Sequence, residues 1–305
     1  MKSILITGGT GLIGSKLIKN LDKGKYKIYI LSRRYNSDSK GVYYIKWDPK
    51  KSKLDLSKIK NIDTIINLAG ESIDGSRWTN NYKRKILESR VNSTKLLFEK
   101  IKKMNILPKS IISASATGYY KNNTLEPQNE SSNPGDDFLS DVVVKWEKEI
   151  LKFKSIGIRT TIFRIGLVLS KDGGVLKKLY PIFKLFLGVP VGSGNQIISW
   201  IHEKDMIDLI IKAIEDDNFE GIYNAVAPER INNKEFTKSL SKALGRFSYP
   251  NIIKAPSLII KIIFGEQSNL VLNGLNVTSK NLSKVKFIFK FSKLDSALSE
   301  IYKKN

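Results

Sequence analysis

The sequence contains no cysteine and only one histidine, His202, in 305 residues. Without thiols the chain can form no disulfide framework and no thiolate metal site, and it has no cysteine nucleophile. A single imidazole also argues against an ordinary zinc site and against a Ser-His-Asp hydrolase. We therefore expect no metal centre, and any chemistry has to come from other side chains.

Long apolar runs are missing as well. No stretch approaches the roughly 20 apolar residues of a membrane span. The apolar run 3–7 breaks at once into glycines, unlike the core of a signal peptide. The hydrophobic share of 41% and the charged share of 27% are those of a globular chain with one large domain or two ordinary ones. We expect a cytoplasmic protein without a membrane span.

Arginine is scarce, since it accounts for nine of the 52 basic residues in a chain of net charge +23. A charge of this size invites a nucleic-acid or membrane-surface interpretation. The lysines, however, are spread among many Asn and Ile, which indicates a drift in overall composition. No zinc-finger, homeodomain or RNP-type motif accompanies them. We expect no specific nucleic-acid partner, a small-molecule substrate, and a monomer or homodimer.

Short apolar runs rich in β-branched residues alternate with longer amphipathic stretches. This alternation is typical of βαβ units and a parallel sheet. From residue 228, two or three helices and the alternating segment 286–291 predict a smaller mixed domain. The predicted strands are 3–7, 27–31, 43–47, 63–69, 110–115, 159–166 and 221–226, and the predicted helices are 12–22, about 79–103, about 138–154 and 203–216.

A glycine-rich turn, "TGGTGLIG", follows the first predicted strand and opens the first helix. Its glycines satisfy both G-x-G-x-x-G and G-x-x-G-x-x-G. Such glycines make a tight turn, let the backbone approach a pyrophosphate and let helix and strand pack closely, while the helix N-terminus attracts the anion. The alternative is a purely structural turn. The residues predicted to bind a dinucleotide here are Thr7, Gly8, Gly9, Thr10, Gly11, Leu12, Ile13 and Gly14.

The end of the second strand indicates which dinucleotide. An NAD site normally carries an acid about 20 residues after the glycines, but Ser32, Arg33 and Arg34 stand there. A hydroxyl and guanidinium groups suit the 2′-phosphate of NADP(H), so we favour NADP(H) over NAD(H), with two surface cations as the alternative. Further cofactor candidates are Asp48, which could equally form a turn, the turn residues Leu68, Ala69, Gly70 and Glu71, and Arg90.

Several segments together resemble one known family. "TGGTGLIG", "INLAGE", "SASATGYY" and "SWIHEKD" are similar to the extended short-chain dehydrogenases/reductases. "RWTNNYKRKILESRVNSTKLL", "GLVLSKDGG" and "GEQSNLVLNGLNV" resemble more narrowly the sugar-nucleotide-epimerase-like subgroup, which has an extra C-terminal domain of undefined role. The resemblance covers nearly the whole chain.

The resemblance implies a two-part α/β protein. A Rossmann-type doubly wound parallel sheet would bind NADP, and a smaller C-terminal α+β domain would bind substrate, with the active site between them. The corresponding boundaries are 1–165 plus about 200–226 for the NADP-binding domain, and 166–199 plus 227–305 for the smaller one.

The same resemblance assigns catalytic positions. Ser115 matches the serine that holds the substrate carbonyl, Asn92 matches a helix asparagine of the proton relay, and Tyr119 matches the tyrosine that follows the serine in extended members. The family's Tyr-x-x-x-Lys pair is missing, because Phe138 and Val142 stand in its place. A register shifted by one gives Leu139 and Val143, and Lys145 is not preceded by a tyrosine at that spacing.

Two hypotheses of function follow. The first is an atypical NADP(H)-dependent oxidoreductase or epimerase-like enzyme, acting on a small carbonyl, hydroxyl or nucleotide-sugar-like substrate. Ser115 would polarise the carbonyl, and the proton would be moved by Tyr119, Tyr120, Glu71 or Glu130. The second is a non-catalytic NADP(H)-binding sensor or regulator. Candidate substrate contacts are Arg77, Arg90 and Arg164 for an anionic group, with Trp78, Tyr120 and His202, although packing or a structural hydrogen bond would also explain the last three.

Overall fold

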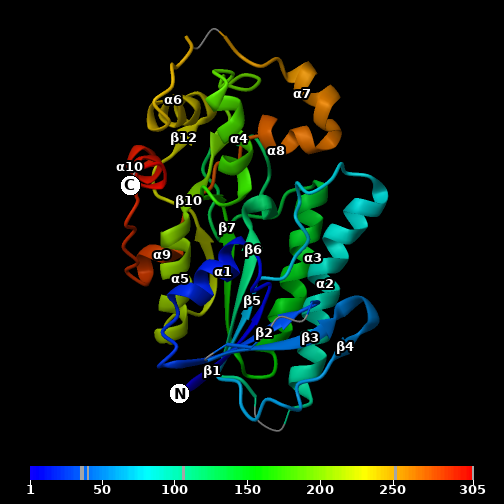
Figure 1. The fold of residues 1–305 in the computed structure, drawn as a ribbon. Coiled ribbons are helices and arrows are strands. Elements are labelled where there is room, and N and C mark those ends of the chain that lie inside the picture. The colour runs from blue at the N-terminus through cyan, green and yellow to red at the C-terminus, as the bar shows by residue number, and fades with distance from the viewer. Residues whose placement is uncertain (35–37, 40, 105–106, 251–252, 304–305) are drawn as a thin grey trace.

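A computed structural model, which describes residues 1–34, 38–39, 41–104, 107–250 and 253–303, places the predicted strands in one sheet (Figure 1). The strand order is β11-β7-β6-β5-β1-β2-β3-β4, and every pair is parallel except β3 with β4. The strands are β1 (Lys2–Thr7), β2 (Tyr26–Ser32), β3 (Val42–Asp48), β4 (Lys53–Leu54), β5 (Thr64–Asn67), β6 (Ser110–Ala116), β7 (Arg159–Ile165) and β11 (Gly221–Ala225). The chain order reverses between β1 and β5, which is where a doubly wound sheet binds ligands at its carboxyl ends.

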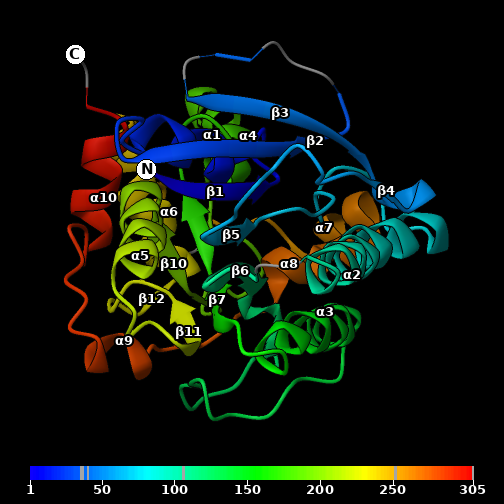
Figure 2. The ribbon, with the colours of Figure 1, turned by 90° about the horizontal axis from the view of Figure 1, so that it is seen from below.

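Helices cover both faces of this sheet (Figures 1 and 2). Successive side chains of a strand point to opposite faces. Along β1, Ile4 and Ile6 therefore join one buried core, whereas Leu5 joins the other. The first core packs on α1 (Leu12–Asn20) and α5 (Glu203–Glu215), and the second on α2 (Asn80–Lys102) and α3 (Phe138–Lys154).

A third core lies beyond the carboxyl ends of the strands (Figure 1). It is formed by α4 (Gly174–Lys184), α6 (Asn233–Ala243), α10 (Leu294–Ile301) and the short strands β8 (Leu167–Leu169), β9 (Ile197–Ile198), β10 (Trp200–His202) and β12 (Ile231–Asn232). The helices α7 (Ser257–Phe264) and α8 (Asn269–Leu272) lie in the same C-terminal part of the chain, whereas α9 (Asn281–Lys284) packs beside β11 and places Leu282 in the first core. Short 3-10 turns lie at Pro49–Lys51, Thr117–Tyr119 and Gly265–Ser268. Within the described ranges, no helix is long and apolar enough to cross a membrane.

The structure corrects three details of the prediction. The strand expected at 63–69 ends at Asn67. Beyond it, the Leu68 N–H still reaches the Thr7 carbonyl of β1, but Leu68 and Ala69 both donate to the Thr7 hydroxyl and the ladder stops there. The described residues after 228 form five helices, α6 to α10, where two or three were expected. The alternating segment 286–291 is no strand: its Phe287 and Phe289 pack against the core under α5, while Ile288 points to solvent.

Candidate functional site

The predicted glycine turn joins β1 to α1 and is tightly packed. Gly8 has a φ of +68°, a backbone conformation that side chains disfavour. A Cβ on Gly14 would lie 2.4 Å from the Gly8 carbonyl oxygen, so only glycine lets the helix approach the strand this closely. By contrast, a Cβ on Gly11 would meet only that carbonyl oxygen, at 3.3 Å, among the described atoms. Gly11 therefore borders open space, as required where a ligand approaches the backbone.

The N-terminus of α1 is free to bind an anion. Its N-cap is Gly11, which provides no side-chain cap, and its first turn contains no acidic residue. The first backbone N–H groups of a helix have no partner within the helix and carry a partial positive charge. A hollow of about 330 Å³ opens beside this helix end, and it is lined by Thr10, Gly11, Leu12, Ser15, Lys16, Lys19, Asp172 and Gly173. The residues present thus fit a pyrophosphate at this place.

The end of β2 lies next to this turn. A Cβ on Gly9 would contact the Ile30 side chain, which places the glycine turn beside β2. Ser32 is buried, and its hydroxyl accepts a hydrogen bond from the Arg34 backbone N–H at 3.3 Å. Arg33 and Arg34 are exposed and directly follow Ser32. Two guanidinium groups at the end of β2 are thus available to a phosphate.

Asp48 has a local structural role at the end of β3. Its Oδ1 accepts hydrogen bonds from the Lys50 and Lys51 backbone N–H groups and so caps the short 3-10 turn that follows. The alternative interpretation of Asp48, as a residue that forms a turn, therefore agrees with its position. A contact from Asp48 to an adenine stays a prediction.

The ends of β1 and β5 are tied together by a buried polar cluster. The Thr7 hydroxyl donates to Asn67 Oδ1 at 2.8 Å and accepts from the backbone N–H groups of Leu68 and Ala69 at 3.1 Å. Asn67 in turn donates to Thr94 of α2. Thr7 is fully buried, so its side chain fixes the exit of β5 and does not face a ligand. Asn67 was not among the expected site residues, although a lone amide in an apolar strand indicates buried hydrogen bonding.

Arg90 lies behind the exposed turn that follows β5. A Cβ on Gly70 would be 3.0 Å from the Arg90 guanidinium carbon, and this guanidinium also lies 5.4 Å from the Trp146 ring centroid. Burial lowers the pKa of Arg90 to about 10, although the negative charge of Glu71 opposes the shift. The backbone N–H of Glu71 is held by Ser89 of α2. Arg90 thus presents a partly desolvated cation beside the carboxyl end of β5, a suitable place to bind an anionic group.

Ser115, at the carboxyl end of β6, is held by a buried charge pair. Its hydroxyl donates to Glu147 Oε1 at 2.6 Å. Glu147 also receives two hydrogen bonds from Arg164, from Nε at 2.8 Å and from Nη2 at 2.7 Å. Burial alone would lower the pKa of Arg164, but the hydrogen bonds and charge of Glu147 outweigh it and raise the pKa, so the group stays a cation.

This geometry changes the predicted roles of two residues. The proton of Ser115 points to Glu147, so donation to a substrate carbonyl would require that bond to break. Arg164 is buried and engaged on its carboxylate partner, so it is not placed to bind an anionic substrate group. Glu147 was not among the expected site residues, because its position in "KWEKE" is indistinguishable from a solvated helix charge.

The two tyrosines after β6 differ in their surroundings. Tyr120 is buried, and its hydroxyl joins Arg164 Nη1 at 2.9 Å and Asn224 Oδ1 at 2.8 Å. It therefore belongs to the polar interior and is not placed to touch substrate. Tyr119 is half-buried, and its ring centroid lies 3.4 Å from the Arg164 guanidinium carbon. No hydrogen bond joins the Tyr119 hydroxyl to another residue of the described ranges, so this phenol is the one left for substrate.

Three other predicted positions have surroundings that do not favour their expected roles. Asn92 lies on the exposed side of α2, whereas Thr94 of the same helix faces inward and binds Trp146. Trp78 donates its indole N–H to the Ile73 carbonyl and packs edge-on against Phe138 at 5.3 Å. Glu130 is a half-buried carboxylate whose oxygens accept from backbone N–H groups of 224, 280 and 281. The relay role of Asn92 and the proton-transfer role of Glu130 therefore have no support in this geometry.

The place expected for the Tyr-x-x-x-Lys pair is apolar. Phe138 and Val142, one turn apart at the start of α3, belong to a small cluster with Tyr82 and Ile86 of α2. Arg77, in the loop after β5, is exposed, and its guanidinium lies against Gly265. The loop that carries Arg77 thus contacts the C-terminal end of α7.

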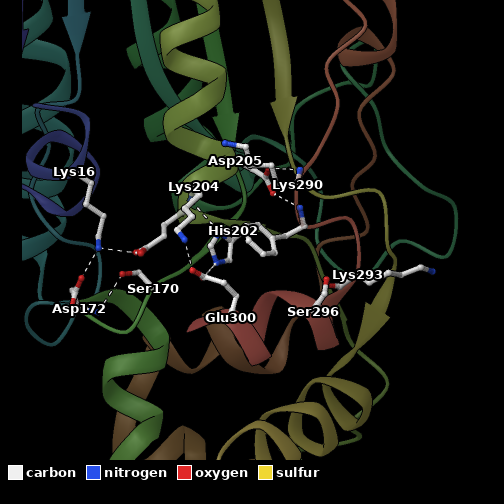
Figure 3. A network of polar contacts seen from close by, with 12 residues as sticks. Lys16, Ser170, Asp172, His202, Lys204, Asp205, Lys290, Lys293, Ser296 and Glu300 are labelled. Carbon is white, nitrogen blue, oxygen red and sulfur yellow. Dashed lines mark hydrogen bonds and ion pairs between the residues drawn. The ribbon is translucent and has the colours of Figure 1, made fainter. Parts of the chain in front are cut away.

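His202 holds the two parts of the chain together (Figure 3). It is fully buried at the start of α5, where Nδ1 accepts from the Lys204 backbone N–H and Nε2 lies 3.0 Å from Glu300 of α10. Its ring stacks on Phe291 at 3.9 Å. Asp205 receives the backbone N–H groups of residues 290 and 291. The structural interpretation of His202 therefore describes its place better than a contact with substrate.

Comparisons with known proteins agree with this architecture. The model of the NAD dependent epimerase/dehydratase family matches residues 4–225, and a second model, "Domain of unknown function (DUF1731)", matches residues 255–301. The epimerase family protein SA0724 of Staphylococcus aureus strain N315 is 37% identical over 306 residues, which cover 99% of this chain and 100% of that protein. SERP0438 of Staphylococcus epidermidis is 35% identical over 305 residues, covering 99% of this chain and all of that protein.

Solved structures give the same result. The human epimerase family protein SDR39U1 (isoform 2), crystallised with NADPH, matches with a TM-score of 0.87 and 31% identity, covering 98% of this chain and 99% of that one. A nucleoside-diphosphate sugar epimerase from Corynebacterium glutamicum matches with a TM-score of 0.78 and 28% identity, covering 99% of this chain and 58% of that one. The fold and the glycine turn define a Rossmann-type protein of the extended short-chain dehydrogenase/reductase class. The chain belongs to the NAD dependent epimerase/dehydratase family.

Proposed function

We propose that this protein is an NADP(H)-dependent oxidoreductase or epimerase-like enzyme that acts on a small carbonyl, hydroxyl or nucleotide-sugar-like substrate. The observation that carries the proposal is Ser115, which a buried charge pair fixes at the carboxyl end of β6. β6 is two strands from the glycine turn, on the same edge of the sheet. A polar side chain fixed so firmly beside a dinucleotide site suits a reacting group.

The dinucleotide would be held by the residues whose geometry fits it. The N-terminus of α1 would bind the pyrophosphate, and Gly11 leaves room for its approach. Arg33 and Arg34 would bind a 2′-phosphate, which supports a preference for NADP(H). The human relative crystallised with NADPH is in keeping with this preference. Bound NADP(H) supplies the hydride donor or acceptor.

The side chains suggest how a proton is handled. Because the Ser115 proton is donated to Glu147, the Ser115 oxygen is left to accept a hydrogen bond from a substrate hydroxyl. Arg164 neutralises Glu147, so the carboxylate holds the serine proton in place and is a weak base. Tyr119 then moves the proton, with the Arg164 cation against its ring.

Arg90 is the favoured contact for an anionic substrate group. Its guanidinium is partly desolvated behind Gly70, on the same edge of the sheet as Ser115. A cation that has lost part of its hydration gains more from a carboxylate or phosphate than an exposed lysine does. We therefore infer that Arg90 recognises an anionic group of the substrate or cofactor, whereas Arg164 neutralises Glu147 in a buried ion pair.

Cofactor preference is tested by titrating the protein with NADPH and with NADH and following nicotinamide fluorescence. We expect tighter binding of NADPH, and we expect Arg33→Gln/Arg34→Gln to reduce that preference by about tenfold or more, because each lost charge-assisted hydrogen bond is worth roughly 1.5–3 kcal/mol. Arg84→Gln, which changes an exposed arginine on α2, is the matched control. Equal binding of both cofactors, or an unchanged ratio in the double variant, would contradict the preference.

Turnover is tested with NADPH and a panel of aldehydes, ketones, enones and nucleotide sugars. The loss of near-ultraviolet absorbance reports hydride transfer, and chromatography of the nucleotide sugars reports epimerisation. We expect one substrate class to react, and we expect Ser115→Ala and Tyr119→Phe each to lose most of that activity while NADPH still binds. Activity that survives in both variants would exclude the proposed proton path.

A second function, a non-catalytic NADP(H)-binding sensor, is favoured by one observation. The start of α3, where related enzymes carry their tyrosine and lysine, holds Phe138 and Val142 in an apolar cluster. If NADPH binds tightly and no substrate of the panel reacts, the sensor explains the protein better than the enzyme does.

A further inference from the structure

Two segments of the smaller domain expose large aliphatic and aromatic side chains. One is the end of α4 and the loop that follows it, and the other is α7. Their most prominent members are 48–69% exposed: Leu185, Phe186, Leu187, Leu258, Ile259 and Ile262. We call this set the α4–α7 face. Single exposed apolar residues are ordinary, but a cluster of this kind marks an interaction surface.

The two segments are neighbours in space. The backbone N–H of Gly192 donates to the Ala255 carbonyl at 2.9 Å, and the Ala255 N–H donates to the Pro190 carbonyl at 2.8 Å. These bonds place the loop after α4 against the residues just before α7. Figure 1 shows both helices at the end of the molecule opposite the N-terminus. The α4–α7 face therefore caps one end of the protein.

The chain around this face is basic and free of acids. Neither of the segments 173–202 and 236–265 contains an Asp or Glu. Lys184 and Lys261 are exposed on α4 and α7 themselves, and Lys254 lies three residues before α7. The Arg246 guanidinium lies 5.0 Å from the Phe186 ring. Aliphatic side chains flanked by lysines, with no acids among them, have the chemistry of helices that lie in a lipid headgroup region.

We propose that the α4–α7 face is a docking surface for an anionic lipid bilayer. Leu258, Ile259 and Ile262 of α7 would enter the boundary between headgroups and acyl chains. Lys184 and Lys261 would remain among the headgroups, since long basic side chains reach toward anionic lipid while their stems stay on apolar surface. This mode of binding needs no membrane-spanning helix, and it is independent of the proposed enzymatic activity.

Charge complementarity favours a lipid surface over a second copy of this chain. Two copies meeting through this face would bring two basic segments without acids against their own copies in proteins of net charge +23 each. Like charges brought together at an interface oppose association. An anionic bilayer complements both the apolar side chains and the lysines.

The test is flotation of the purified full-length protein with vesicles at low ionic strength. We expect binding to vesicles of phosphatidylcholine mixed with phosphatidylglycerol, and little binding to vesicles of phosphatidylcholine alone. Leu258→Glu/Ile262→Glu should lower the partition coefficient on the mixed vesicles by about tenfold or more, because it replaces two inserted apolar groups by anions. Its melting temperature should match that of the unchanged protein, since both side chains are exposed.

The matched control is Leu125→Glu/Ile288→Glu, which makes the same charge change at side chains that are 88% and 86% exposed elsewhere. It should bind vesicles like the unchanged protein. Equal loss in both double variants would mean that net charge alone attracts the protein, and it would overturn the proposal. Failure of the unchanged protein to bind the mixed vesicles would also overturn the proposal. If light scattering then shows a dimer that the α7 variant loses, the face binds a second copy of the chain instead. If the α7 variant fails to fold, Leu185→Glu in the loop after α4 provides the same test.

Discussion

Replacing Arg164 by methionine removes one half of a charge pair whose side chains are 3% and 6% exposed. Glu147 then keeps only the Ser115 hydroxyl as a donor and loses both hydrogen bonds from the guanidinium. Breaking a buried pair in this way costs about 3–5 kcal/mol, because a carboxylate is left in the interior without its counterion. Glu147→Leu should cost a similar amount, since it leaves the guanidinium uncompensated.

The double variant Arg164→Met/Glu147→Leu should recover most of this loss. With neither charge present, the remaining penalty is chiefly the unpaired Ser115 hydroxyl, about 1–3 kcal/mol. The losses in free energy of unfolding caused by the two single variants, when added, should therefore exceed the loss in the double variant by several kcal/mol. At roughly 2 °C per kcal/mol for a chain of this size, each single variant should melt about 6–10 °C lower.

Urea unfolding and thermal melting followed by circular dichroism measure these differences. Lys154→Met is a suitable control, because its pair with Glu220 is exposed and should be worth under about 1 kcal/mol. If the two single variants each cost less than the control pair, or if their effects simply add, then Glu147 and Arg164 do not form a coupled buried pair. The account of Ser115 as a fixed group would fail with it.

Three further predictions concern other parts of the chain. Gly14→Ala should lower the melting temperature, because its Cβ would lie 2.4 Å from the Gly8 carbonyl oxygen. Gly11→Ala should change the free energy of unfolding by less than about 1 kcal/mol but weaken NADPH binding. Burial lowers the pKa of His202, so as the pH drops the imidazole is protonated in the unfolded chain before it is protonated in the folded one. The free energy of unfolding should therefore fall as the pH drops below about 6.5. His202→Gln should flatten that part of the pH profile measured by urea unfolding. Val142→Lys should cost more than about 3 kcal/mol in the same assay, because it buries an ammonium group in an apolar cluster.

The parts of the fold that depend on local pattern could be predicted from the sequence. Apolar β-branched runs located the strands of the sheet except the two-residue β4, and the glycine turn fixed how β1 passes into α1. The segment 286–291 shows where this approach fails. Its alternation is that of a strand, but the alternating side chains pack against the core under α5 while the backbone binds Asp205 instead of a neighbouring strand. Periodicity shows which side chains are buried and not what the backbone pairs with.

The candidate site depended more on tertiary contacts. Motif matching selected Asn92, but Arg90 and Thr94 face the interior one turn apart, and a residue midway between them points outward. Helical phase could have excluded Asn92. Nothing local distinguishes Glu147 from a solvated helix charge, because its partner, Arg164, lies on a neighbouring strand and enters only when α3 packs on the sheet. Buried ion pairs between distant segments are therefore the features that the sequence leaves undetermined.

The buried charges also connect Ser115 with the C-terminal part of the chain. From Arg164 the path of hydrogen bonds continues through the Tyr120 hydroxyl to Asn224, whose amide donates to the Thr278 carbonyl. Glu130 binds the backbone of Asn224 and the backbone of residues 280 and 281 at once. The segment 278–281 thus supports the same polar interior that orients Ser115. The C-terminal part therefore supplies part of the framework that holds Ser115 in place.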